Sequence, residues 1–278
     1  MRKAVFIVAF FLSLWTWSFL GTKQYLKEEK LKKTSSVQDV YLPGNAKYDS
    51  NIEKGLCSGE EFSRAVISLT FDDGWKEIYE NAVPILDAAG IKSTHYVNIY
   101  GPAEPEKFVT SEEIIKAYRN GHEIASHGIN HKRFTNLTDP EIRREMENSH
   151  HLLSELGIDI TGFAYPYGEF TDYSVELSRR SKYSAVRITI PSLNDRKTDR
   201  FMLYGYELQN WMVFDPYIKR LVDRAVADKK WLILIFHQVA KPDYQYYTSP
   251  QDLSRLVEYL VKQKVPVMRV KDVIEKCY

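Results

Sequence analysis

The chain has 278 residues, which is enough for one large α/β domain with an appendage or for two small domains. Its 38 Lys and Arg residues nearly balance its 37 Asp and Glu residues, giving a formal net charge of +1 at pH 7. Because a nucleic-acid-binding protein normally carries a basic excess, we expect no nucleic acid partner.

The first 21 residues form a separate hydrophobic segment. Arg2 and Lys3 precede the uncharged run 4–20, whose 17 residues span about 25 Å as a helix, against about 30 Å for a bilayer core. Residues 1–21 are therefore predicted to be a signal anchor or a cleaved signal peptide. Bulky side chains, not a small-residue cleavage motif, precede Gly21, which favours the anchor. We expect a membrane-anchored, extracytoplasmic domain, which is secreted instead if the segment is cleaved.

The composition changes after this segment and again near residue 64. Residues 22–63 are rich in Lys, Glu, Ser, Asn and Gly without a sustained period, which predicts a polar linker. Residues 64–278 alternate strand and helix patterns, as βα units around a parallel sheet or barrel do. The predicted strands are 65–69, 93–99, 122–126, 161–164, 184–188, 201–208, 231–236 and 265–270. The predicted helices are 75–89, 110–120, 138–156, 172–182, 215–227, 251–262 and 271–276.

Two cysteines, Cys57 and Cys277, lie near the two ends of this predicted domain. Outside the cytoplasm a disulfide between them is chemically permitted. The sequence does not show whether the sulfurs meet, so a disulfide and two unpaired thiols both stay open.

Two adjacent carboxylates follow the first predicted strand. Asp72 and Asp73 come directly after a buried apolar stretch, and Gly74 then allows a sharp turn. Neighbouring residues at a strand end point in different directions, so one carboxylate can hold a cation while the other faces the reacting atoms. The alternative is a simple turn in which Asp73 caps a helix.

Two histidines follow the third predicted strand. His127 and His131 are four residues apart, a spacing that lets both bind one ion from a single helical turn. A pair of surface histidines on a helix is the alternative interpretation. The zinc-protease motif HExxH is excluded, because Gly128 stands where that motif has its glutamate.

Four segments in order resemble the motifs of the polysaccharide deacetylases, the NodB-homology or carbohydrate esterase 4 family. They are TFDDG at 70–74, SHGINH at 126–131, FAYPYG at 163–168 and LILIFH at 232–237. The resemblance covers about residues 65–271. It implies an α/β fold, a distorted (β/α) barrel of about seven strands, with the site at the C-terminal ends of the strands.

The resemblance also implies a metal site. Asp73, His127 and His131 correspond to the metal ligands of the family. Two nitrogens and one oxygen leave positions for water and substrate, as in catalytic zinc sites. We expect a divalent cation, zinc first, with cobalt, manganese and nickel as alternatives.

The remaining implied residues move protons or bind developing charge. Asp72 corresponds to the general base and His237 to the acid that protonates the departing amine. The backbone N–H of Tyr167 is assigned to the oxyanion. In many relatives the third motif begins with an arginine that pairs with the catalytic aspartate, but here Ala164 occupies that position. Arg187 is the candidate replacement, and a structural ion pair is its alternative role.

The fourth motif of the family, an aspartate and tryptophan region, is not identified. Asp195, Asp199 and Trp211 lie in the corresponding part of the chain without a clear alignment. We expect a monomeric, metal-dependent hydrolase that removes N-acetyl groups from N-acetylhexosamine residues of an extracellular or cell-wall polysaccharide. An O-acetyl esterase and an inactive glycan-binding domain are the alternatives.

Overall fold

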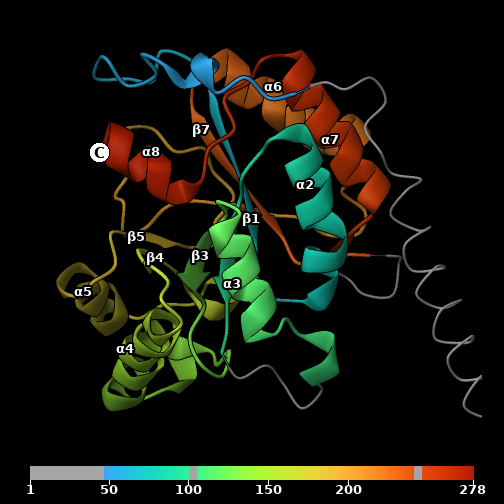
Figure 1. Ribbon diagram of the computed structural model, residues 1–278. Helices are drawn as coiled ribbons and strands as arrows, with labels where there is room; N and C mark the ends of the chain where they lie inside the picture. Colours follow the sequence, from blue (N-terminus) through green and yellow to red (C-terminus); the bar gives the residue numbers. More distant parts are fainter. Residues whose placement is uncertain (1–46, 100–104, 241–245) are drawn as a thin grey trace, which may run out of the picture. The chain divides into compact units, whose positions relative to one another are not determined.

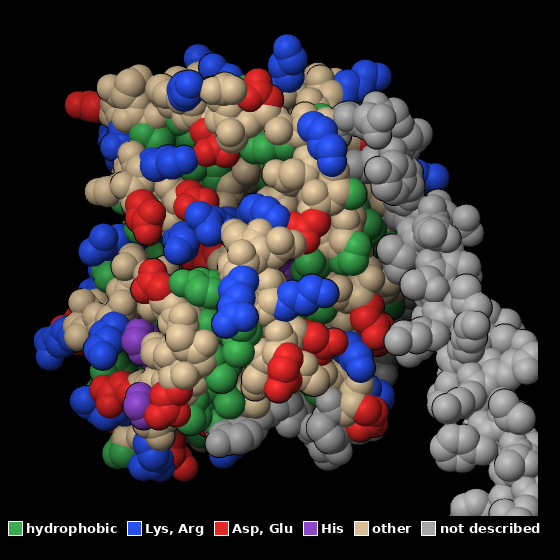
Figure 2. All heavy atoms as spheres, in the orientation of Figure 1, with side chains coloured by type: hydrophobic (Ala, Val, Ile, Leu, Met, Phe, Trp, Pro, Cys, Tyr) green, Lys and Arg blue, Asp and Glu red, His purple; other side chains and the backbone are tan. Residues whose placement is uncertain are grey.

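The computed structural model describes residues 47–99, 105–240 and 246–278 (Figure 1). The predicted N-terminal anchor, 1–21, and most of the predicted linker lie outside these residues. Among the helices that are described, none combines the length and the apolar character needed to cross a bilayer. On the face shown in Figure 2, acidic and basic side chains are interspersed, in keeping with the small net charge.

Seven parallel strands form one sheet in the order β5-β4-β3-β2-β1-β7-β6. Their bounds are β1 Val66–Phe71, β2 Thr94–Val97, β3 Glu123–Ser126, β4 Gly162–Ala164, β5 Ala185–Arg187, β6 Tyr206–Glu207 and β7 Trp231–Phe236. Leu203 forms a bridge with Arg187 of β5, and the same segment then continues into β6. The two outer strands are thereby linked, so the sheet is curled and agrees with the expected distorted barrel. A small second sheet pairs β8 Gln238–Val239 with β9 Tyr247–Thr248.

Helices connect the strands and cover the sheet (Figure 1). The α-helices are α2 Val83–Ala89, α3 Ser111–Arg119, α4 Asp139–Glu155, α5 Asp172–Arg180, α6 Lys219–Asp228, α7 Pro250–Lys262 and α8 Val270–Cys277. The short helices are η1 Ser50–Glu53, η2 Ile78–Ala82, η3 Pro105–Lys107, η4 Phe134–Asn136, η5 Pro166–Gly168 and η6 Phe214–Ile218. Capping boxes start α3 at Thr110 and α4 at Thr138.

The central pair of strands is buried along its whole length. Every residue of β1 and β7 is buried, as the continuous apolar run 231–236 predicts. The two strands pair in parallel from Val66 with Trp231 to Phe71 with Phe236. This register brings the residues that follow each strand to the same edge of the sheet.

The predicted strand 265–270 is wrong, since only Val267 forms a bridge, to Ile67 of β1. From Thr70 onward β2 occupies that edge of β1, so the segment has no further pairing partner there. The predicted helix 75–89 is also interrupted, because the π-helix η2 precedes α2. Pro84, which has no N–H to donate, lies where the two join.

The predicted linker is wrong for its last part, since residues 47–63 pack on the domain. Leu56 and Phe62 are buried in a cluster with Trp231, Met268 and Ile274. Cys57 forms a disulfide with Cys277. The Arg196 guanidinium donates hydrogen bonds to the carbonyl oxygens of both cysteines, at 3.1 and 2.8 Å. These contacts fix the beginning of the described domain to its end.

Candidate active site

Asp72, Asp73 and His237 lie together at the C-terminal edge of β1 and β7. The Asp72 N–H donates to the Phe236 carbonyl at 2.9 Å, which extends the β1–β7 ladder by one residue. Asp73 then takes a positive φ of 71°, and Gly74 follows at 77°. A side chain at Gly74 would be crowded as well, since its Cβ would lie 3.2 Å from Val109 Cγ1. The two carboxylates after this strand have different partners, Arg187 for Asp72 and His131 for Asp73, and lie 3.9 and 3.5 Å from His127 Nε2.

Three potential metal ligands converge beside this turn. Asp73 Oδ1 lies 3.1 Å from His131 Nε2 and 3.5 Å from His127 Nε2. The three ligand atoms all lie within 4.8 Å of one another. Two imidazole nitrogens and one carboxylate oxygen form an open set that suits a divalent cation.

The hydrogen bonds around this cluster leave its ligand atoms available. His127 Nδ1 lies 2.8 Å from the Ala164 carbonyl oxygen, which only accepts, so Nδ1 carries the proton and the Nε2 lone pair faces Asp73. Trp75 Nε1 donates to Asp73 Oδ2 at 2.9 Å, leaving Oδ1 toward the histidines. Burial lowers the pKa of His127 to about 4, which keeps its imidazole neutral. The residues therefore fit a bound cation.

The charge of Asp73 follows from its neighbours. Burial by itself would raise the pKa of Asp73, but the contact with His131 and the proximity of His237 hold it well below the ordinary value. The carboxylate is therefore ionised at neutral pH, as a metal ligand must be.

The predicted helical turn for the two histidines is wrong. Residues 127–133 form an irregular loop after β3, in which Gly128 has a φ of 80° and His131 a φ of 49°. The loop nevertheless brings the two imidazole rings together, with centroids 4.9 Å apart. Asp73, His131 and Tyr167 all combine a side chain with positive φ, a strained conformation that often marks functional sites.

Arg187 reaches the other carboxylate. Its Nη2 donates to Asp72 Oδ2 at 2.5 Å, and both side chains are buried. The guanidinium also lies over the ring of Tyr96, 4.9 Å from its centroid. Asp72 Oδ1 has no hydrogen-bond partner among the described residues. One oxygen is thus fixed by a cation, while the other stays unpaired.

His237 follows β7 and meets an acidic residue from β6. Its Nε2 lies 3.8 Å from Glu207 Oε1, and its ring contacts that of Tyr246. Burial raises the pKa of Glu207, and the nearby His237 partly opposes this effect. His237 therefore lies at the same sheet edge as Asp72, with the carboxyl group of Glu207 as its neighbour.

Residues 59–186 match the family model for polysaccharide deacetylases. The chain belongs to the polysaccharide deacetylase family. It is 25% identical over 170 residues, 60% of its length, to YxkH of Bacillus subtilis (strain 168), whose name proposes a polysaccharide deacetylase. It is 26% identical over 129 residues, 46% of its length, to an Arthroderma benhamiae protein whose name proposes peptidoglycan-N-acetylglucosamine deacetylase activity. The matches span 61% and 29% of those two proteins.

A solved structure supports the same fold. The Xyl-CE4 domain of a multidomain xylanase from the hindgut metagenome of Trinervitermes trinervoides is similar with a TM-score of 0.57 at 22% identity. The similarity covers 77% of this chain and 91% of that domain. At this identity the comparison concerns the architecture alone.

The parallel register of the sheet explains why Ala164 can stand where the third motif has an arginine. Ala164 of β4 lies directly opposite Arg187 of β5 in the parallel register. An arginine at either position starts from neighbouring backbone, and here the one on β5 reaches Asp72. The structure thus supports a local replacement of the arginine that many relatives have in the third motif.

Glu207 was not predicted from the sequence, where Asp195, Asp199 and Trp211 were the candidates for the fourth motif. Asp195 is paired with Lys230 and Asp199 with Arg179, while Trp211 is 58% exposed and donates to Gln209. Glu207 is the acidic residue near the end of the predicted strand 201–208. The rule that polar groups at the C-terminal ends of parallel strands meet was the available signal.

The site opens into a cavity of about 310 Å³ beside the potential metal ligands Asp73 and His131. Tyr167 forms part of its wall, with its ring 4.5 Å from that of His131 and the Arg133 guanidinium 3.9 Å from its centroid. The other wall residues are Trp75, Asn98, Phe108 and Asn130. The stacked rings of Trp75 and Phe108 give this cavity an apolar side.

Proposed function

We propose that this polysaccharide deacetylase family member is a metal-dependent hydrolase that removes N-acetyl groups from N-acetylhexosamine residues of a polysaccharide. The observation that carries the proposal is the convergence of Asp72, Asp73, the two histidines and His237 from three strand ends at one edge of the sheet. The Arthroderma relative, whose name proposes a similar substrate, supports this choice.

Asp72 has the geometry of a general base. Arg187 holds Oδ2, and the unpaired Oδ1 is the oxygen that accepts a proton from the attacking water. A divalent cation held by Asp73, His127 and His131 would polarise the acetyl carbonyl and make a bound water more acidic. Zinc fits the two nitrogens and one oxygen, and cobalt, manganese and nickel are the alternatives to test.

Breakdown of the tetrahedral species requires a proton on the departing nitrogen, since an amine anion is a poor leaving group. We assign this proton to His237, whose Nε2 lies 3.8 Å from Glu207 Oε1 and which follows β7 at the same edge of the sheet as Asp72. The backbone N–H of Tyr167, on a residue with φ of 59°, is the proposed donor to the oxyanion.

The test is acetate release by the purified full-length chain, loaded with each of the four metals in turn, from N-acetylglucosamine oligomers. We expect Asp72→Asn to reduce turnover by about 10² to 10⁴-fold while the bound metal content stays unchanged. Turnover that persists in this variant would contradict the assignment of the base.

The same assay separates the alternatives. A free amine in the product supports the deacetylase, whereas a free hydroxyl from O-acetylated glycans identifies an esterase. Glycan binding without acetate release under every metal would identify an inactive binding domain.

We further propose that the domain acts as an extracytoplasmic monomer tethered by residues 1–21. The Cys57–Cys277 disulfide supports an oxidising compartment, where such bonds persist. Protease accessibility of the domain in intact cells, with a cytoplasmic protein as control, tests this placement.

A further inference from the structure

Glu145 is a buried carboxylate that points at the loop between the two metal-site histidines. It lies in α4, is 5% exposed and shares the buried face of the helix with Ile142, Met146 and Ser149. Its hydrogen-bond partners are neutral groups of the histidine loop. Burying a carboxylate has a large desolvation cost, so Glu145 depends on these hydrogen bonds to offset it.

The contacts of Glu145 occupy both carboxylate oxygens. Oε2 accepts from the backbone N–H groups of Ile129 and Asn130 at 2.8 and 3.0 Å. Oε1 accepts from Asn130 Nδ2 at 2.7 Å. Successive N–H groups that point at one anion form a strong binding concavity for that anion. The carboxylate therefore fixes the two residues that directly precede His131.

Gly128 leaves room in the loop for this carboxylate. A Cβ at Gly128 would lie 3.2 Å from Glu145 Oε2, and the φ of 80° also favours glycine. α4 holds the other end of the loop as well, since Ser149 Oγ lies 2.6 Å from Ser126 Oγ. Ser126 Oγ in turn accepts from the Gly128 N–H at 3.3 Å.

His131 needs such support. Its φ of 49° is unfavourable for a residue with a Cβ, and its side chain retains 23% exposure, against 2% for His127. His127 is fixed by the Ala164 carbonyl at 2.8 Å, and Glu145 is the group that fixes the backbone leading to His131.

We propose that Glu145 is a positioning residue, which holds His131 in its ligand conformation and thereby sets the affinity of the site for a divalent cation. This inference rests on the metal site of the proposed function. It extends that function to a residue that lies outside the ligand set and touches no reacting atom.

The test measures the Zn²⁺ dissociation constant of the full chain by competition with a chromophoric chelator. In Glu145→Gln the remaining oxygen can still accept from the backbone. The new NH₂ group, however, faces Asn130 Nδ2, and two donors form no hydrogen bond with each other. We expect Zn²⁺ affinity to fall about tenfold, the lower end of the effect of removing a group that orients a metal ligand. The matched control is Glu147→Gln on the same helix, where an exposed side chain pairs with Arg143, and it should stay within about twofold of wild type.

A second background shows whether the effect passes through His131. In His131→Ala the ligand is absent, so adding Glu145→Gln should weaken Zn²⁺ no further. An equal loss in both backgrounds, or an unchanged dissociation constant in Glu145→Gln alone, would overturn the proposal. If circular dichroism shows that Glu145→Gln does not fold, Glu145→Asp replaces it. Aspartate keeps the carboxylate, but its shorter side chain no longer reaches the backbone N–H groups of Ile129 and Asn130.

The result is distinguishable from failure of the proposed function. Acetate release by the wild-type chain, together with unchanged Zn²⁺ affinity in Glu145→Gln, removes only the positioning role. Tight Zn²⁺ binding that depends on Glu145, without acetate release from any acetylated glycan, supports the positioning role and removes the deacetylase.

Discussion

Each end of the curled sheet holds one buried carboxylate. The two carboxylates differ in the charge of the groups that bind them. At the C-terminal end Asp72 is 2% exposed, pairs with Arg187 and lies 3.9 Å from His127 Nε2. At the N-terminal end Glu123 is 1% exposed and accepts hydrogen bonds from Thr94 Oγ1 and the Lys271 N–H. One carboxylate is balanced by a cation, whereas the other is held by neutral donors.

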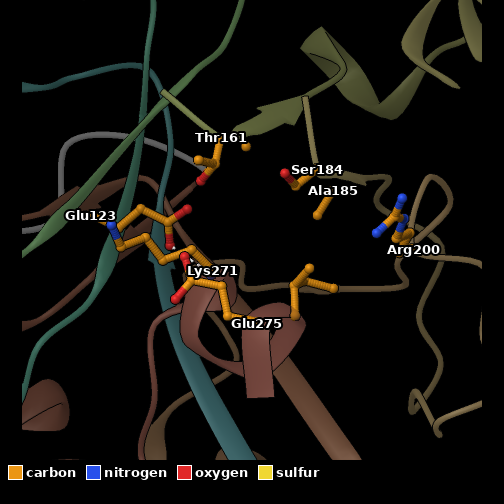
Figure 3. Close-up of a pocket in the computed structure, with 9 residues that line it drawn as sticks. Glu123, Thr161, Ser184, Ala185, Arg200, Lys271 and Glu275 are labelled. Carbon is orange, nitrogen blue, oxygen red and sulfur yellow. Dashed lines mark hydrogen bonds between the residues drawn. The ribbon is translucent and has the colours of Figure 1, made fainter. Parts of the chain in front are cut away.

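The N-terminal end contains a cavity of about 180 Å³ (Figure 3). Glu123 lies on one side of it with Thr161, and Ser184 and Ala185 lie on the other side. Lys271 belongs to the first turn of α8, and the N-cap residue of this helix, Arg269, provides no side-chain cap. Glu123 therefore serves as an acceptor for a helix N-terminus, a structural task.

The difference shows how a buried carboxylate at each end of the sheet acquires its properties from its partners. At the C-terminal end β1, β3, β5, β6 and β7 each end at or next to a charged or titratable side chain. The N-terminal end receives a helix instead, and its carboxylate completes backbone hydrogen bonding. Variants at the two ends should therefore separate loss of activity from loss of stability.

The largest expected effect is at the C-terminal end, for Arg187→Met. The variant leaves Asp72 buried without its cation, which costs about 3–5 kcal/mol of stability for a broken buried pair. We expect acetate release to fall by at least about 100-fold. Adding Ala164→Arg, directly opposite in the register, should restore part of the activity. Full activity in Arg187→Met, measured on folded protein, would contradict a functional pair.

The second-largest effect is expected for the disulfide between Cys57 and Cys277. Replacing Cys57 and Cys277 by Ser removes a cross-link that spans 220 residues of sequence, and should lower the free energy of unfolding by about 2–4 kcal/mol. Urea denaturation measures this loss. Turnover well below the unfolding transition should remain within about twofold, since the disulfide lies away from the cluster. A large loss of turnover would show that the two ends are coupled.

A smaller and pH-dependent effect is expected for Glu123→Gln. Burial raises the pKa of Glu123, so the folded chain keeps this proton to a higher pH than the unfolded chain does. The contribution of this group to stability is complete below the unfolded pKa of about 4.3 and decreases as the pH rises through the folded pKa. Glutamine does not ionise, so the stability of the variant relative to wild type should increase with pH over this window. A relative stability that is the same at every pH would contradict the role of burial.

The smallest effect is expected at the rim of the active site, for Arg133→Ala. Its guanidinium contacts the Tyr167 ring at 3.9 Å and pairs with Glu169 on an exposed surface. Loss of an exposed cation–π contact costs about 0.5–1 kcal/mol. We expect kcat/KM for acetate release to fall by less than about fivefold. A loss as large as that of Arg187→Met would show that Arg133 binds substrate directly.

Sequence patterns predicted the parts of this molecule that depend on local order. The apolar run 231–236 and the strand before Asp72 were found because buried parallel strands are continuous hydrophobic stretches. The two capping boxes were found because a hydroxyl and a glutamate three residues apart specify a helix start. The strand-end positions of Asp72, Asp73, His127, Arg187 and His237 followed from the same patterns.

Other features depend on contacts that no local pattern encodes. The two histidines meet through a loop with positive φ at Gly128 and His131, and their four-residue spacing suggested a helix instead. Glu207 lies near the end of the predicted strand 201–208, but its position 3.8 Å from His237 follows only from the pairing of β6 with β7. Leu56 and Phe62 lie in a segment without apolar periodicity, yet they anchor residues 47–63 to the domain.

The bond between Cys57 and Cys277 has a mechanical consequence. Tension applied between the two ends of the chain passes along covalent bonds through the two sulfurs, because the segment between these cysteines, which are 220 positions apart in sequence, forms a closed side loop. The seven strands and every proposed catalytic group lie within that loop. A force applied between the two chain ends would therefore load the sulfur bridge, and the residues inside the loop would lie off the load path.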